Sequence, residues 1–564
     1  MFNLLLAFLF VARPVIPGKM TPELAQILHN TSDNEKILVI VHMATEYPYD
    51  QLRGMTPVEK CKVFENIALN SQREIVEYLK ALPREIAEVG GQFWIFNGFH
   101  LKATKAVVHE LTKRDDIWFI CHNATINLEQ EMVEKCDSRT PEWNITKVMA
   151  ESCWANGYNG EGVIVGHIST GCDVSHPALI GKWLSPYWID PVYGNPAPYD
   201  DLGRGTHAIG VICGGDGPGP FADDVGIAYG ARYIPTKCSN SSGSTNYALI
   251  DQCMQYLANL KQSGVDIKVI SNCWNSINGS DLHWWDLILN WKNLGILPVF
   301  PVGGNGPNPG TIGSPASYPT VIGVGATDSQ DNIASFSSRG PAPNIYPIND
   351  SSYWYYPSWN LLKPDIAAPG VNIRSAIPNS GYATYSSTAR ATPHISGAAA
   401  ILFQKDPELT VNELYNLLRV NCDQPPQGAP YPNNNYGWGR LNIWKALQAI
   451  TGVREDSKSE TMIEMSVSPN PFLHRCVIKF QIPSIKSQTN SKSQNSNENL
   501  AVLRIYDAAG RLVKDFSRLT VNGERSTVFW DGCDDSGRNL PAGVYFVRLD
   551  VDDFKKVEKV VFLR

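Results

Sequence analysis

Three short segments of the sequence carry the side chains that a nucleophilic hydrolase uses. Asp173 and His176 lie in the first, His207 in the second, and Ser386 and Ser387 in the third. Such an enzyme needs a hydroxyl that attacks a carbonyl carbon, an imidazole that takes the hydroxyl proton, and a carboxylate that orients the imidazole. Because this geometry must hold within fractions of an ångström, the elements that position these residues decide whether they can react.

Those elements belong to residues 141–450, where apolar runs alternate with turns and amphipathic segments. Five runs are rich in Val and Ile and do not alternate between apolar and polar residues; they cover 162–170, 230–238, 266–274, 295–304 and 319–327. Runs of this kind are typical of a parallel sheet covered by helices on both faces. The sequence therefore predicts an α/β domain here.

Six segments of this domain resemble, in order, the motifs of the subtilisin-like serine peptidases, the subtilase or S8 family. They are GEGVIVGHISTGCDVSHPAL, GRGTHAIGVICG, PVGGNGPNPG, ASFSSRGP, KPDIAAPGVNI and TARATPHISG. The resemblance covers most of residues 143–450. It implies the subtilisin fold, peptide hydrolysis as the activity of the family, and the positions that would carry a catalytic triad.

The triad positions implied by the resemblance are all substituted. Ser169 stands where the family has an aspartate, Arg204 where it has the catalytic histidine, and Ala389 where it has the nucleophilic serine, whereas Asn305 keeps the side-chain oxyanion donor. Ala389 has no heteroatom, and Arg204 stays protonated and cannot act as a base. We therefore predict a pseudopeptidase, a binding or scaffold protein without efficient peptide hydrolysis.

The alternative is an active serine endopeptidase with a rewired site, in which Ser387 or Ser386 reacts with the help of His207. Each nearby side chain also has a structural explanation. Asp173 and His176 belong to the turn after the first strand, His207 lies one helical turn beyond Arg204, and the serines cap the following helix. The structural explanation is preferred.

Two further predictions concern the cleft of this domain. The family binds substrate backbone along a strand that ends in glycine, but here the stretch is Cys273, Trp274 and Asn275, so peptide binding should be altered. Arg204, Arg390 and a helix N-terminus would converge on one anion pocket. Its ligand would be a carboxylate of a protein or peptide, including the chain's own acidic segment 127–135. In the alternative, Arg204 pairs with Asp200, Asp201 or Asp173.

The domain is flanked by two smaller blocks. Residues 36–121 predict the element order β-α-β-β-α-β of a small ferredoxin-like α+β fold and resemble the inhibitor-type prodomain of subtilases. Without a nucleophile this block should stay attached and keep the groove occupied. Residues 462–564 predict an all-β sandwich after a linker at 451–461.

The last block resembles C-terminal sorting domains of the type IX secretion route, through SVSPNPF, LRIYDAAGRLVKDF, FWDGCDDSGRNLPAGVYFVRLD and KKVEKVVFLR. This resemblance implies the type IX machinery as a partner. Residues 1–18 predict a signal peptide, because their apolar run has about the length of a signal-peptide hydrophobic region and is too short to span a bilayer; the alternative is a buried N-terminal strand. The expected location is secreted or at the cell surface.

Composition excludes several other classes of function. The net charge is −7 and no Lys/Arg-rich block occurs, which argues against nucleic acid as a partner. No later segment approaches about twenty apolar residues, so no integral membrane segment is expected in the mature chain. The twelve cysteines form no CxxC pair and no Cys/His spacing typical of zinc. No metal and no cofactor are therefore predicted.

Overall fold

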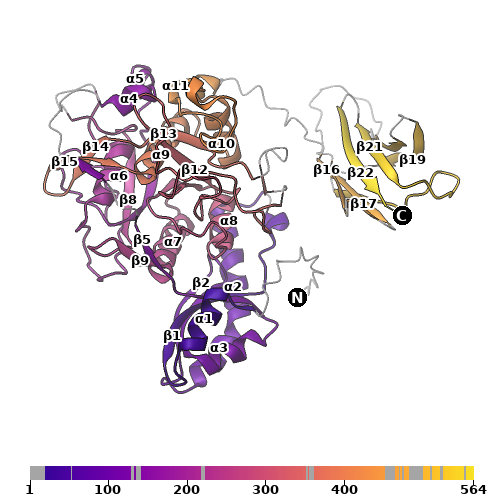
Figure 1. Cartoon of the computed structure of the whole chain (residues 1–564), viewed down its shortest axis with the longest axis horizontal. Helices are drawn as coiled ribbons and strands as arrows, with labels where there is room; N and C mark the ends of the chain where they lie inside the picture. Colours follow the sequence, from indigo (N-terminus) through magenta and orange to yellow (C-terminus); the bar gives the residue numbers. More distant parts are fainter. Residues whose placement is uncertain are drawn as a thin grey trace, which may run out of the picture. The chain divides into compact units, whose positions relative to one another are not determined.

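The structure, a computed structural model, consists of two compact units, Met1–Ile450 and Thr451–Arg564 (Figure 1). It describes residues 19–563 except 53, 129–131, 135–141, 218–222, 351–352, 355–360, 451–463, 469, 473–474, 482–499, 508–510, 521–524 and 552–553. The expected signal peptide and linker lie outside the described residues. In the described part of the chain, no helix is both long and apolar enough to cross a membrane.

The first unit begins with a block that we call the N-terminal block, residues 22–122. Its elements are α1 (Pro22–Asn30), β1 (Lys36–Met43), α2 (Pro57–Ala81), β2 (Ala87–Phe93), β3 (Gly98–Thr104), α3 (Lys105–Thr112) and β4 (Ile117–His122). The strands form one antiparallel sheet in the order β2-β3-β1-β4. The long helix α2 starts sharply because Thr56 and Glu59 form a reciprocal capping box and Pro57 occupies the first turn.

A six-stranded parallel sheet forms the centre of the rest of this unit, as the Val/Ile-rich runs predict. Its strands are β7 (Ile164–Ser169), β8 (Arg232–Lys237), β10 (Ile267–Asn272), β11 (Leu297–Pro301), β12 (Ile322–Thr327) and β13 (Ile366–Pro369). They lie in the order β13-β12-β11-β10-β7-β8. The strands are not alternating in sequence because both faces of the sheet are buried.

Helices cover the two faces of this sheet (Figure 1). They are α6 (Arg204–Cys213), α7 (Tyr247–Gln262), α8 (Trp285–Asn293), α9 (Thr388–Lys405), α10 (Val411–Val420) and α11 (Ile443–Ala449). On β10, Val269 packs in the cluster that contains α6 and α9, whereas Ile270 packs in the cluster that contains α7 and α8. Successive side chains of a strand thus enter opposite cores.

The N-terminal block shares its core with α7 and α8. Phe64 and Trp94 from the block lie in the same buried cluster as Trp284 and Trp285. The backbone N–H of Trp94 donates to Gln255 Oε1 on α7 (3.1 Å). These contacts hold the block to the domain through apolar burial as well as polar bonds.

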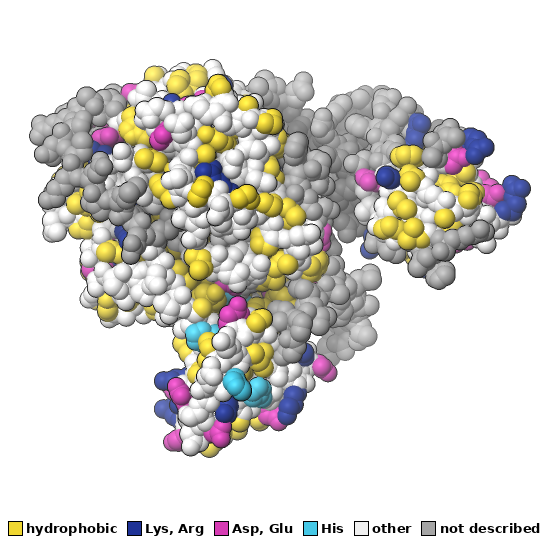
Figure 2. Space-filling model, in the orientation of Figure 1, with side chains coloured by type: hydrophobic (Ala, Val, Ile, Leu, Met, Phe, Trp, Pro, Cys, Tyr) yellow, Lys and Arg dark blue, Asp and Glu magenta, His cyan; other side chains and the backbone are white. Residues whose placement is uncertain are grey.

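The second unit contains two antiparallel sheets whose apolar faces share one core. One sheet has the order β16 (Glu464–Ser468), β17 (Cys476–Gln481), β20 (Arg525–Trp530), and the other β19 (Leu512–Thr520), β18 (Leu500–Asp507), β21 (Gly543–Val551), β22 (Phe554–Phe562). Phe472, Trp530 and Phe562 contact one another in that core. Leu512, Phe529 and Phe546 are exposed, and Figure 2 shows hydrophobic side chains on the visible face of this unit.

Candidate functional site

The candidate site lies where β7, α6, α9 and two loops meet. Ser169 is the last residue of β7 and is fully buried. Its hydroxyl has no hydrogen-bond partner among the described residues. The next residue, Thr170, accepts the Gly205 backbone N–H on its Oγ1 (2.9 Å), which ties the end of β7 to the first turn of α6.

The first turn of α6 is organised by the Asp200 carboxylate. Asp200 accepts hydrogen bonds from Thr170 Oγ1 (2.8 Å), from the Gly203 N–H (2.8 Å) and from the Thr206 N–H (2.8 Å). Gly205 is required because a Cβ at this position would lie 2.0 Å from the carbonyl oxygen of Gly171. This network presents Arg204 as the first residue of α6.

The carboxylates that the sequence offers to Arg204 are engaged by other donors. Asp200 serves the network above, Asp201 pairs with Lys237 Nζ (2.5 Å), and Asp173 accepts the Asn379 N–H (3.0 Å). The guanidinium of Arg204 lies beside the 240–244 turn, because a Cβ at Gly243 would lie 3.7 Å from its Nη1.

The first turn of α9 closes the other side of the site. Ala389 packs against Ala208 of α6 and Cys273, and the Cys273 thiol donates to the carbonyl oxygen of Ala389 (3.3 Å). The neighbouring Thr388 Oγ1 accepts the backbone N–H of Gly303 (3.2 Å). The structure therefore brings together the segments that carry the predicted triad positions.

Arg390 does not line an open anion pocket with Arg204. Its side chain is only 1% exposed, and its Nη1 donates to the backbone carbonyl of Arg204 (3.0 Å). The side chain runs inward from α9 toward the core, with its guanidinium 5.8 Å from the Tyr385 ring. Arg390 therefore offers little surface to a dissolved carboxylate, and the anion pocket stays a prediction.

The His207 imidazole hydrogen-bonds backbone carbonyls and not a serine hydroxyl. His207 Nε2 donates to the carbonyls of Ile373 (3.0 Å) and Ala383 (3.1 Å), and burial together with the Arg390 charge lowers the pKa of His207 well below its usual value. Ser386 Oγ bonds Asn372 instead. His207 and Ser386 therefore hydrogen-bond other groups, and the rewired site with Ser386 or Ser387 stays a prediction.

The other two imidazoles have structural roles. His176 Nε2 donates to the carbonyl of Gly381 (2.9 Å), which ties the turn after β7 to β15 (Gly381–Ser386). His394 lies on α9, as expected; its Nδ1 donates to the carbonyl of Arg390 (3.0 Å) and its Nε2 accepts from Asn144 (2.9 Å). Both side chains hold backbone segments around the site.

The segment predicted to bind substrate backbone, residues 273–275, has buried side chains. Trp274 is 1% exposed and packs against Trp284 and Phe300. Asn275 is 7% exposed, and its amide nitrogen would lie 3.0 Å from a Cβ at Gly303. Asn275 therefore reaches the loop after β11, which also carries the exposed Asn305.

The chain leaving the N-terminal block runs along both walls of the site. β5 (Thr125–Asn127) pairs antiparallel with β9 (Ser244–Asn246), and the Leu128 N–H donates to the Gly243 carbonyl (2.9 Å). Further along the chain, β6 (Met132–Glu134) pairs antiparallel with the end of β15. Ser386, at the end of β15, lies three residues before Ala389, so the segment reaches the immediate vicinity of the site.

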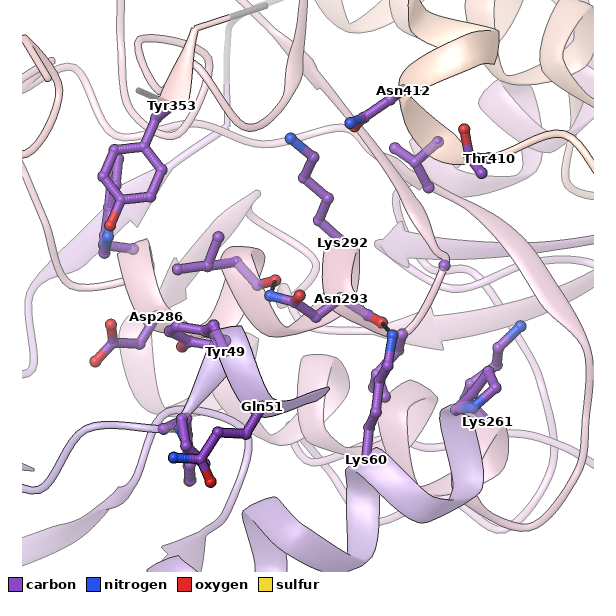
Figure 3. A pocket seen from close by; sticks show the side chains of 18 of the residues that line it. Tyr49, Gln51, Lys60, Lys261, Asp286, Lys292, Asn293, Tyr353, Thr410 and Asn412 are labelled. Carbon is purple, nitrogen blue, oxygen red and sulfur yellow. Dashed lines mark hydrogen bonds between the residues drawn. The ribbon is translucent and has the colours of Figure 1, made fainter. Parts of the chain in front are cut away.

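A separate cavity of about 820 Å³ lies between the N-terminal block, α8 and the start of α10 (Figure 3). Lys60, Lys261 and Lys292 line it together with Asp286. Lys60 Nζ donates to the carbonyl of Asn293 (2.8 Å). None of the predicted site residues lines this cavity.

Comparison with known proteins identifies similar sequences. The model of the family described as "Subtilase family" matches residues 160–439. Subtilisin DY of Bacillus licheniformis is 30% identical over 313 residues, which cover 55% of this chain and 100% of that protein. Bacillopeptidase F of Bacillus subtilis (strain 168) is 29% identical over 429 residues, or 70% of this chain and 29% of the relative. Serine protease AprX of the same strain is 33% identical over 315 residues, or 50% of this chain and 65% of the relative. The chain thus spans less than two thirds of Bacillopeptidase F and of AprX.

Proposed function

We propose that this chain, which belongs to the subtilase family, is a pseudopeptidase of that family and acts as a binding or scaffold protein. The observation that carries the proposal is the residue at the start of α9. There the methyl group of Ala389 packs against Ala208 and Cys273, where a subtilase would need a reactive hydroxyl. An alanine cannot form the acyl-enzyme on which that mechanism depends.

The other two triad positions support the same proposal. Ser169 supplies no charge to orient a base, and its hydroxyl is buried without a hydrogen-bond partner among the described residues. Arg204 is always protonated and cannot accept a proton from a nucleophile. Loss of nucleophile, base and orienting anion together removes each chemical step of the triad mechanism.

The N-terminal block is proposed to be a retained prodomain. From β1 to β4 its elements follow the order β-α-β-β-α-β, and the block shares a core with α7 and α8. The segment that follows it pairs with β9 on one wall of the cleft and β15 on the other, as a bound peptide would. Without a nucleophile the chain cannot cut this segment, so its own backbone would occupy the groove.

The remaining parts of the proposal concern export and partners. Residues 1–18 would be removed as a signal peptide, and residues 462–564 would engage the type IX secretion machinery. The mature protein would then be secreted or displayed at the cell surface. Its ligand would be a protein or peptide that binds outside the occupied strands or displaces them.

Labelling with a fluorophosphonate probe tests the absence of an activated serine. The purified chain is compared with a variant cut at a protease site inserted after Leu128, so that the cleft can open, and with the triple variant Ser169→Asp, Arg204→His, Ala389→Ser as the positive control. We expect no mass increase in the first two proteins. A stoichiometric adduct on either of them would overturn the proposal, and its position would identify the nucleophile.

A further inference from the structure

A second cluster of reactive side chains lies between the N-terminal block and the subtilase domain. His42 comes from β1, Cys121 from β4, and His283 from the turn before α8. His42 Nε2 lies 2.9 Å from His283 Nδ1, and Cys121 Sγ lies 3.7 Å from the same nitrogen. The three candidate ligand atoms all lie within 4.8 Å of one another. Three elements from two blocks thus bring two nitrogens and a sulfur close together.

The cluster is closed to solvent and its rings are held by aromatic neighbours. His42 and His283 are each 1% exposed, and Cys121 is 4% exposed. His42 stacks on Phe119 with ring centroids 4.2 Å apart, and His283 stacks on Tyr247 at 4.7 Å. Such packing fixes the ring orientations before any ligand binds.

Asp251, on α7, orients His283 from behind. The fully buried carboxylate accepts from His283 Nε2 (2.9 Å) and from His100 Nε2 (3.1 Å). When His283 is neutral, this bond keeps its proton on Nε2 and leaves the Nδ1 lone pair facing His42 and Cys121. Carboxylates that accept from the far nitrogen of a histidine are the usual outer partners of a metal-binding imidazole.

We propose that His42 Nε2, Cys121 Sγ and His283 Nδ1 bind a borderline transition-metal ion, with Zn²⁺ the preferred one, and that this ion fastens the N-terminal block to the subtilase domain. Thiolate and imidazole are the ligands that zinc takes in proteins, and a water molecule would complete the tetrahedron. Tetrahedral zinc would place the two nitrogens about 3.3 Å apart and a nitrogen and the sulfur about 3.6 Å apart. The spacings of 2.9 and 3.7 Å need only a small opening between the two imidazoles.

The competing explanation is a proton in place of the metal. In that case His283 carries the proton, because burial lowers its pKa but the Asp251 carboxylate and the Cys121 side chain together raise it well above its usual value. A hydrogen-bonded chain would then run from His42 through His283 and Asp251 to His100. The two explanations share the same contacts and differ in metal content and in whether Cys121 Sγ is bound to a metal ion.

Metal content and a cobalt spectrum distinguish them. The full chain is stripped of metal, dialysed with Zn²⁺ and analysed for bound zinc, and Co²⁺ is titrated into a second sample. We expect about one equivalent of zinc and a thiolate-to-cobalt charge-transfer band in the near ultraviolet. Cys121→Ser should lose the band and weaken metal binding at least ~10-fold. Cys61→Ser, which changes another buried thiol of the same block, should keep both.

Measurement on the unmodified chain keeps the inference falsifiable even if a variant does not fold. A wild-type protein that retains no zinc and shows no charge-transfer band would refute the metal site and favour the proton. Equal loss of metal in both cysteine variants would also refute it. Because these readouts do not involve peptide hydrolysis, the metal site and the pseudopeptidase proposal can fail separately.

Discussion

The buried imidazole of His167 gives the chain a measurable sensitivity to acid. His167 lies on β7, two residues before Ser169, and is fully buried. Neither ring nitrogen makes a hydrogen bond of normal geometry among the described residues. Burial, reinforced by the Arg390 charge, lowers its pKa from 6.5 to about 3, although the nearby Ser271 backbone slightly favours the charged form. The folded protein therefore holds this ring neutral down to acidic pH.

The magnitude follows from these two pKa values. Because the native pKa is depressed, the contribution of His167 to stability is present above pH 6.5 and is lost as the pH falls toward 3. At pH 5 the unfolded chain binds a proton that the native state does not, which costs about 2 kcal/mol, against about 0.2 kcal/mol at pH 7. His167→Leu removes this pH-dependent cost. It also removes two ring nitrogens that lack hydrogen bonds, and each of these nitrogens costs ~1 kcal/mol or more. The variant should therefore gain stability over wild type by about 2 kcal/mol more at pH 5 than at pH 7.

The assay is urea unfolding of wild type and His167→Leu at pH 7 and pH 5, followed by tryptophan fluorescence. His109→Gln, which replaces an exposed imidazole on α3, is the matched control and should follow wild type at both pH values. If the free-energy difference between His167→Leu and wild type is the same at both pH values, then His167 is not held neutral and the reasoning is wrong.

Three other predictions rest on local geometry. Gly171→Ala should destabilise the first unit by about 3 kcal/mol or more, because φ is +107° and a Cβ would lie 1.9 Å from the Tyr199 carbonyl oxygen. Gly157→Ala, with φ +85° but open space, should cost only about 1 kcal/mol, and thermal unfolding measures both. Burial and the Arg419 charge lower the pKa of Lys292 to about 8, so a methyl-labelled Lys292 should titrate with a midpoint near that value by NMR; a midpoint above 10 would contradict the burial. Among the described cysteines only Cys533 is not buried, so a maleimide should label it before the others; faster labelling of any buried thiol, mapped by mass spectrometry, would contradict the packing.

The central sheet and its family could be predicted from the sequence, whereas the cluster between the blocks could not. Val/Ile-rich runs predict strands that are buried on both faces. β7 and β10 lie within such runs, and their side chains pack into two hydrophobic cores on opposite faces of the sheet. His42 and His283 are 241 positions apart, and Cys121 and His283 are 162 apart, so no spacing motif connects them. Metal-ligand motifs are short spacings along the chain, and residues this far apart form no such motif.

Within the site, the sequence predicts which segments meet better than it predicts where their side chains point. The positions of Ser169 and Ala389 follow from motif order alone. The sequence did not predict that Arg390 would point into the core, because an arginine in the first turn of a helix usually reaches solvent. The packing of α9 against α6, with the Arg204 carbonyl as acceptor, decides its direction. The sequence offers no signal for that contact.

The order of β5, β6, β9 and β15 along the chain affects how the first unit folds during synthesis. β5 and β6 leave the ribosome before β9 and well before β15, their partners. The N-terminal block can fold early, because domains form from the N-terminus during translation. Under the proposal that the N-terminal block is a retained prodomain, the segment that carries β5 and β6 is already present when β15, the partner of β6, is synthesised. A competing peptide would then have to displace a segment of the same chain in order to pair with β9 or β15.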